Sequence, residues 1–224
     1  MIVSHKHKFI FLKTKKTAGT SIEISLSRYC GPNDIITPIA PEDEKIRAGL
    51  GIKPQNYIVP FDGTAKNKRN EDGNIVFSNH NKAKSIREIL GQDVWNSYYK
   101  FSFDRSPWDK VISYYYFRMA KSNKTIDFEQ FLEKKKFKGC YNYPIYTIDD
   151  KLAVDFLGKY ENLDQDLTAV CEHLGLAYDG WLPNAKGNYR EKNKRNYRNM
   201  YNNEQQKLIE NFFKKEIDIL GYEF

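Results

Sequence analysis

The chain has 224 residues, with 36 Lys and Arg against 29 Asp and Glu, which gives a formal net charge of +7. Its content of 40% hydrophobic and 15% aromatic residues can fill a core, so a wholly disordered chain is excluded. The longest stretch without a charge, residues 139–148, is far shorter than the ~20 apolar residues that span a bilayer. Residues 1–224 show no dividing linker, and we expect a single domain.

The termini and cysteines indicate the cellular setting. Only four apolar residues, 9–12, follow the basic start, whereas a secretory signal needs ~7–15. Cys30, Cys140 and Cys171 match neither a disulfide framework nor a zinc-ligand spacing. We therefore expect three reduced thiols in a cytoplasmic protein. The positive net charge favours an anionic partner without identifying it.

The first 30 residues predict a strand, a loop and a helix. Residues 8–12 are apolar and β-prone, and a small polar loop follows them. From Thr20 the apolar residues predict a helix that ends near Gly31 and Pro32. We expect the residues before this strand, with His5 and His7, to be frayed.

The middle of the chain begins with a loop-rich region, residues 31–73, that holds five of the eight prolines. Strands are then predicted over 74–78 and 99–104. The predicted helices are a short one over 41–47, one capped by Ser85 and Glu88, and one that starts at Pro107. Strands that alternate with helices predict an α/β domain with a parallel sheet.

Two helices are predicted in the C-terminal third. One spans residues 163–174 and stops at Gly175, and its apolar residues fall on one face. The other repeats this pattern from Leu208 to Leu220, before Gly221. We interpret both apolar faces as parts of the core.

The loop over residues 13–21 is the first candidate for chemistry. It lies between a strand and a helix, where backbone N–H groups and a helix N-terminus converge in a geometry that binds phosphate. Lys16 adds a positive charge, and Ala18 and Gly19 let an anion approach the backbone closely. Hydroxyl donors complete the loop: Thr17, Thr20 and Ser21. The alternative is a basic, capped loop that binds nothing.

This loop does not match the nucleotide-triphosphate pattern G-x-x-x-x-G-K-[ST], because its lysine precedes its glycine. The order Lys-Thr-Ala-Gly-Thr-Ser instead resembles the 5′-phosphosulfate loop of sulfotransferases that use 3′-phosphoadenosine 5′-phosphosulfate (PAPS). Downstream, residues 101–115 resemble the 3′-phosphate element of that family. In this element Arg105 ends a strand and Ser113 follows two turns into a helix, and the resemblance implies that both bind the 3′-phosphate.

Further segments resemble carbohydrate-type and bacterial-type members of the family: residues 36–47, 159–166 and 197–224. The resemblance therefore spans nearly the whole chain. It implies a P-loop-like, three-layer α/β fold with a central parallel sheet flanked by helices. One departure is Lys15, where many members have proline.

The resemblance implies in-line transfer of a sulfuryl group from PAPS to a hydroxyl of a small molecule or glycan, and we expect the acceptor to be a carbohydrate. Two residues are candidates for the chemistry. Lys16 is the candidate that stabilises charge on the leaving phosphate. His80 follows the predicted strand 74–78, and we expect it at the sheet edge where the cofactor loops emerge, as the base. Three carboxylates are the alternative base: Glu42, Asp43 and Glu44. The chemistry requires no metal.

Other functions remain open at this point. Residues 186–198 hold six basic residues against one glutamate, with tyrosines interleaved. We interpret them as a cover for the cofactor's 3′-phosphate and adenine. The alternatives are a kinase-like P-loop protein, against which the missing Gly-Lys-Ser/Thr speaks, and a nucleic-acid module, against which Arg105 and Ser113 speak. We thus expect no nucleic-acid partner, and the sequence names neither the acceptor nor an oligomeric state.

Overall fold

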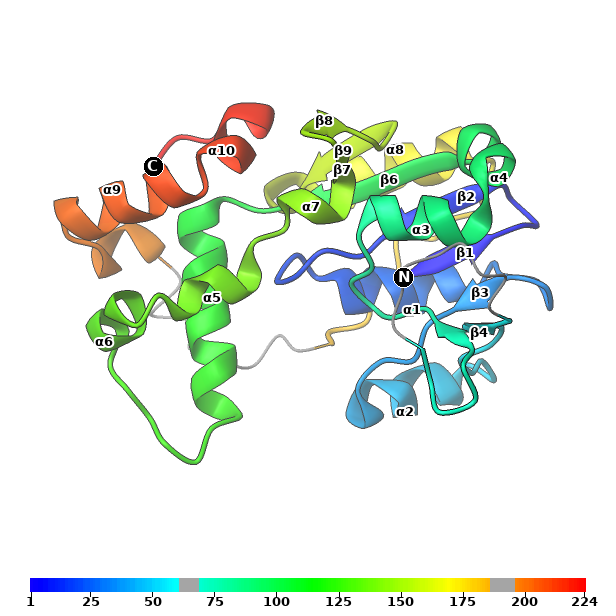
Figure 1. The fold of residues 1–224 in the computed structure, drawn as a ribbon, viewed down its shortest axis with the longest axis horizontal. Coiled ribbons are helices and arrows are strands. Elements are labelled where there is room, and N and C mark those ends of the chain that lie inside the picture. The colour runs from blue at the N-terminus through cyan, green and yellow to red at the C-terminus, as the bar shows by residue number, and fades with distance from the viewer. Residues whose placement is uncertain (61–68, 186–195) are drawn as a thin grey trace.

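A computed structural model describes residues 1–60, 69–185 and 196–224, and its centre is a five-stranded sheet (Figure 1). The strand order is β3-β1-β2-β6-β9. The last three of these run parallel, whereas β1 is antiparallel to both of its neighbours. Their bounds are β1 Ile2–Ser4, β2 Phe9–Leu12, β3 Ile35–Ile36, β6 Tyr99–Asp104 and β9 Phe156–Lys159. This mostly parallel sheet, flanked by helices, confirms the predicted α/β fold class.

The other elements complete the chain. Two small antiparallel pairs lie outside the main sheet: β4 Ile58–Val59 with β5 Ile75–Val76, and β7 Thr147–Ile148 with β8 Lys151–Leu152. The α-helices are α1 Gly19–Ser27, α2 Pro41–Gly49, α3 Ala83–Leu90, α4 Gln92–Ser97, α5 Pro107–Ala120, α6 Phe128–Glu133, α7 Tyr143–Tyr146, α8 Leu163–His173, α9 Asn203–Phe212 and α10 Lys214–Leu220. Short 3₁₀ turns are η1 Lys136–Cys140, η2 Tyr160–Asn162 and η4 Tyr197–Met200.

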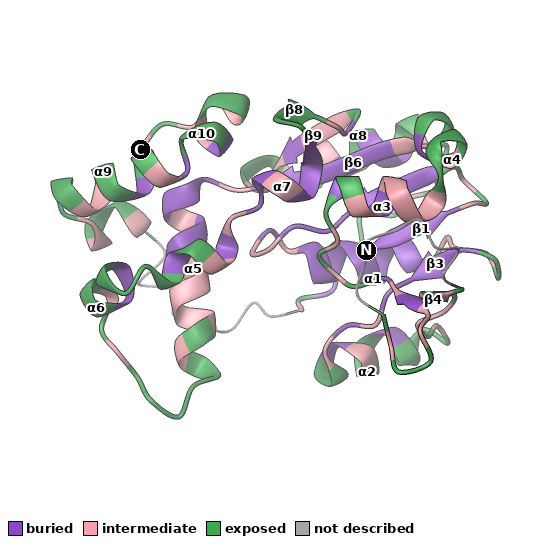
Figure 2. Ribbon diagram, in the orientation of Figure 1, coloured by how far each residue is buried: buried purple, intermediate pink, exposed green. Residues whose placement is uncertain are grey.

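The strands of the main sheet are mostly buried (Figure 2). Side chains alternate along each strand, so they pack on both faces of the sheet. On one face Ile10 and Leu12 pack in a core with residues of α3, α4 and α7. On the other, Phe9 and Phe11 pack with α1 and α8. Helices on both faces of the sheet make three layers.

A third core is built by helices at one end of the sheet. Trp108 and Val111 of α5 pack against Phe131 of α6 and against Ile209 and Phe213 near the C-terminus. Figure 1 shows α5, α6 and α9 grouped beside the sheet, with α5 the nearest of the three to the strands. Helix α5 thereby connects the helical group to the end of β6.

Several predicted boundaries are wrong. The N-terminal residues are a buried strand rather than a frayed end, because β1 pairs with both β2 and β3. The first helix ends at Ser27, where i→i−3 bonds tighten the chain. Ser85 lies inside α3, whose N-cap is Lys82. The last helix is broken at Phe213 into α9 and α10.

Candidate active site

A cavity of about 1000 Å³ opens where the 13–21 loop, α5 and the segment after β9 meet. It brings together residues that are far apart in sequence. The predicted residues in its lining are Lys16, Ala18, Gly19, Thr20, Ser21, His80, Arg105 and Ser113. Glu42, Asp43 and Glu44, the alternative candidates for the base, are described but lie outside this lining. The cavity is therefore the candidate site.

The 13–21 loop leads from β2 into the first turn of α1, which is the predicted strand–loop–helix order. Two of its residues have left-handed backbones, Lys16 at φ +65° and Ala18 at φ +56°. Such conformations cost roughly 1–3 kcal/mol for residues other than glycine and persist only where the surroundings fix them. The loop is thus held in its shape by contacts with the rest of the protein.

Thr17 supplies one of these contacts. It is the predicted loop residue whose hydroxyl turns inward, where it lies 2.8 Å from the hydroxyl of Thr14. The Thr14 hydroxyl also donates to the carbonyl oxygen of Phe103 in β6. The side chain of Thr17 therefore braces the loop on the sheet instead of lining the cavity.

Arg105 links the two candidate phosphate elements. Its Nη1 donates to the carbonyl oxygen of Lys16 at 3.3 Å, so the end of β6 and the 13–21 loop are in direct contact. Its Nε and Nη2 donate to Asp109 at 2.8 and 2.5 Å, and its guanidinium lies 4.0 Å from the ring centroid of Tyr160. Ser113 lies about two turns into α5, the helix that follows Arg105, and lines the same cavity.

Lys16 extends along the cavity wall. Its ammonium lies 4.2 Å from the ring centroid of Phe117, which is also a lining residue. A cation over an aromatic face is attracted by the ring quadrupole, and the contact limits where the flexible side chain can go. The ammonium of Lys16 therefore lies against Phe117 of α5, in the lining of the cavity.

His80 lines the cavity, but it does not lie where the sequence predicts. The strand before it, β5, pairs with β4 and not with the main sheet, so the expected sheet-edge position is wrong. The imidazole instead approaches the loop directly, with Nδ1 2.9 Å from the carbonyl oxygen of Lys13. A carbonyl only accepts, so Nδ1 carries the proton and Nε2 keeps its lone pair.

The surroundings keep this imidazole neutral. The residue as a whole is exposed, but protein atoms around the ring desolvate it, and this lowers the pKa of His80 to about 4. The hydrogen bond to the carbonyl oxygen of Lys13 opposes this shift, and the charge of Lys13 adds to it. At neutral pH the ring is thus an unprotonated base with its Nε2 available.

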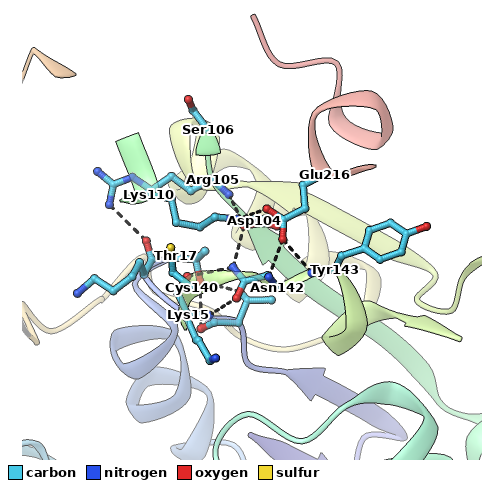
Figure 3. A network of polar contacts seen from close by, with 12 residues as sticks. Lys15, Thr17, Asp104, Arg105, Ser106, Lys110, Cys140, Asn142, Tyr143 and Glu216 are labelled. Atoms are coloured by element: carbon cyan, nitrogen blue, oxygen red, sulfur yellow. Dashed lines mark hydrogen bonds and ion pairs between the residues drawn. The ribbon is translucent and has the colours of Figure 1, made fainter. Parts of the chain in front are cut away.

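A buried polar network beneath the loop contains functional candidates that the sequence reasoning missed (Figure 3). Lys110 of α5 bonds to Asp104 at the end of β6 and to Glu216 of α10. Asn142 joins this network to Lys15 of the loop through hydrogen bonds to both backbone groups of that residue. A proline at position 15 could not donate the first of these bonds.

These observations place the 13–21 loop, Arg105 and His80 around one cavity. A comparison with known protein families matches residues 1–223 to the sulfotransferase family. The chain belongs to the sulfotransferase family. It is also similar to an uncharacterized protein of the archaeon Archaeoglobus fulgidus, with 36% identity over 95 residues, which cover 41% of this chain and 79% of that protein. No solved structure matches.

A second buried network lies at the start of the loop in this sulfotransferase. Lys13 donates to Glu23 of α1 at 2.6 Å and to the side-chain oxygen of Asn79 at 3.1 Å. Arg47 of α2 lies 3.7 Å from Glu23 and is also buried. Burial works to raise the pKa of Glu23, but the charge of Lys13 and of the Met1 amino group outweighs it and holds that pKa below its usual value.

Cys30, Cys140 and Cys171 are free, and burial raises the pKa of each thiol. Within the described ranges, no group of three or more metal-ligating side chains is found, and no helix is long and apolar enough to cross a membrane. Most of the predicted cofactor cover, residues 186–195 of 186–198, lies outside the described residues.

Proposed function

We propose that this sulfotransferase transfers a sulfuryl group from PAPS to a hydroxyl of a carbohydrate acceptor. The observation that supports this most is the joint position of the 13–21 loop, the Arg105 and Ser113 element and His80 around one cavity. The cavity's lining fits a bisphosphorylated adenosine chemically, because it offers a helix N-terminus and cations from two separate segments.

The protein groups divide the work. The backbone N–H groups at the start of α1, with Lys16, hold the 5′-phosphosulfate, and Arg105 with Ser113 holds the 3′-phosphate. When bound, PAPS supplies the sulfuryl group and a phosphate leaving group. Lys16 stabilises the negative charge that this phosphate gains as the S–O bond breaks. His80 accepts the proton of the acceptor hydroxyl through Nε2 as the new O–S bond forms.

The test of the donor site is calorimetry with adenosine 3′,5′-bisphosphate and, separately, ATP. We expect the bisphosphate to bind more tightly than ATP. Arg105→Ala should weaken bisphosphate binding by ~1.5–3 kcal/mol, because it removes a charged hydrogen-bond donor. Arg118→Ala removes an exposed charge from α5, the helix that follows Arg105, and should leave binding unchanged. Equal or tighter binding of ATP would contradict the proposal in favour of a kinase-like protein.

The test of the base is a transfer rate measured against pH, with acceptors found by mass spectrometry of glycans incubated with PAPS. His80→Ala should lower kcat by ~10²–10⁴-fold and leave bisphosphate affinity intact. The lowered pKa predicts that the wild-type rate falls on the acid side with an apparent pKa near 4. Turnover of His80→Ala at the wild-type rate would assign the base to another residue.

A further inference from the structure

Asn142 is a fully buried residue at the start of α7, and its side chain touches the backbone of the 13–21 loop. Its Oδ1 accepts the N–H of Lys15 at 2.9 Å, and its Nδ2 donates to the carbonyl oxygen of Lys15 at 3.0 Å. The same Nδ2 donates to Asp104 at 2.9 Å. One amide thus satisfies both backbone polar groups of a single loop residue.

These bonds act where the loop is strained. Lys15 comes directly before Lys16, the first of the two left-handed residues. Bonds to both sides of Lys15 fix the orientation of the peptide groups that enter Lys16. A second link adds to the restraint, because Lys15 Nζ donates to the carbonyl oxygen of Gly139 at 2.8 Å. The loop is therefore anchored at the residue before its first left-handed residue, Lys16.

Asn142 is itself held from the C-terminal helix. Glu216 of α10 accepts the backbone N–H groups of Asn142 and Tyr143, at 2.6 and 2.9 Å. Lys110 pairs with Glu216 and Asp104, and all three side chains are fully buried. Figure 3 shows Asn142 between this ionic cluster and Lys15. The amide cannot easily turn away from the loop, since its donors and acceptor are engaged on both sides.

From this geometry we infer that Asn142 is a positioning residue, which holds the 13–21 loop in its phosphate-binding shape before any ligand arrives. This inference rests on the proposed function for the identity of the ligand only. Asn142 does not line the cavity, and so it acts through the backbone of Lys15 and Lys16 rather than through contact with substrate. Preorganised donors of this kind bind an anion without the cost of ordering the loop.

The first arm of the test measures the loop without ligand. Hydrogen exchange, followed by mass spectrometry, compares loop amides in the wild type, Asn142→Ala and Tyr146→Phe. The Tyr146 hydroxyl donates to Asp104 at 2.9 Å, so its loss removes one bond from the same network without touching the loop. We expect exchange in the loop to rise about tenfold or more in Asn142→Ala and to stay at the wild-type rate in Tyr146→Phe.

The second arm measures affinity for adenosine 5′-phosphate and adenosine 3′-phosphate. Asn142→Ala should lose about tenfold in affinity for the 5′-phosphate, which the loop binds, and keep its affinity for the 3′-phosphate. Should Asn142→Ala fail to fold, Asn142→Ser replaces it, because a serine hydroxyl is too short to reach both groups of Lys15.

The outcomes separate the two proposals. Unchanged loop exchange in the Asn142 variant, or an equal rise in Tyr146→Phe, overturns the role of Asn142. So does an equal loss of affinity for both monophosphates. A wild type that binds neither the monophosphates nor the bisphosphate overturns the proposed function, while the exchange arm still decides whether Asn142 holds the loop.

Discussion

Two buried ionic networks hold the two sides of the 13–21 loop, and the balance of charge around their carboxylates differs. At the start of the loop, Glu23 lies between Lys13 and Arg47. Beneath the loop, Asp104 and Glu216 share Lys110. Glu23 also has the Met1 amino group 2.9 Å away, and the charges of Lys13 and of this amino group lower its pKa, while Arg47 is divided between Glu23 and Glu44. Glu216 instead shares Lys110 with a second buried carboxylate, and burial raises its pKa to about 7.

This difference bears on the anion that we propose the loop binds. Lys13 enters the first network through its own side chain, whereas Lys15 is reached through the neutral amide of Asn142. The uncharged amide of Asn142 thereby separates the carboxylate of Asp104 from the backbone of Lys15. The networks anchor the loop while Glu23, Asp104 and Glu216 stay out of the cavity lining, where we propose that phosphate binds.

The largest expected effect comes from removing the cation that two carboxylates share. Lys110→Met leaves Asp104 and Glu216 buried without their ammonium and should cost ~3–5 kcal/mol in the free energy of unfolding. Lys13→Met should cost less, about 1–3 kcal/mol, because Glu23 keeps Arg47 nearby. Urea unfolding of both variants measures the two costs. If Lys13→Met were the more damaging change, charge balance would not be what distinguishes the networks.

A smaller effect is expected where the loop packs on the first network. A Cβ added at Gly19 would lie 2.8 Å from Cγ of Lys13 and 3.2 Å from the carbonyl oxygen of Thr14. Lys13 is buried and ion-paired, so it cannot easily move aside, and Gly19→Ala should cost ~1–3 kcal/mol. Gly31→Ala is the matched control, since its Cβ would make only ordinary contact with Lys6. Equal unfolding midpoints for the two variants would show that the loop has room to adjust.

The sequence could predict the parts of the site that are local. The loop between β2 and α1, and the pair Arg105 and Ser113 around the start of α5, each lie within a short segment with a recognisable pattern. The α/β class was also predictable, because strands and helices alternate. These features depend on spacing along the chain, which a sequence displays directly.

The rest depends on long-range contacts that spacing does not display. Asn142 and Glu216 reach the network from 38 and 112 residues beyond Asp104, and neither belongs to a motif. The pairing of β5 with β4 was missed for the same reason, and with it the route by which His80 reaches the cavity. The buried strand β1 was missed because its three residues are too few to show an alternation.

The next prediction concerns the pH dependence of the second network. The pKa of Glu216 rises from its ordinary 4.5 to about 7 in the fold. Between these values the folded chain keeps a proton at Glu216 that the unfolded chain has released, so raising the pH lowers stability at this residue. Glu216→Gln should remove this contribution.

The measurement is urea unfolding at pH 5, 6 and 7. The stability of the wild type relative to Glu216→Gln should fall as the pH rises. Asp218→Asn, on the exposed face of the same helix, should show a constant difference from the wild type. A constant difference for Glu216→Gln as well would mean that Lys110 holds Glu216 ionised throughout.

The smallest expected effect has the opposite sign and belongs to the first network, through the bond from His80 to the carbonyl oxygen of Lys13. The pKa of His80 falls from 6.5 to about 4, so between these values the unfolded chain holds a proton that the folded chain lacks. Raising the pH across this window therefore increases stability at His80. The gain should be small because part of the residue is open to solvent. The measurement is thermal unfolding from pH 4 to 7. The rise in stability with pH should be absent in His80→Asn and present in His173→Asn, which changes an exposed residue of α8. A rise that persists in His80→Asn would assign it to another group and would remove the reason to expect a neutral base in the cavity near pH 5.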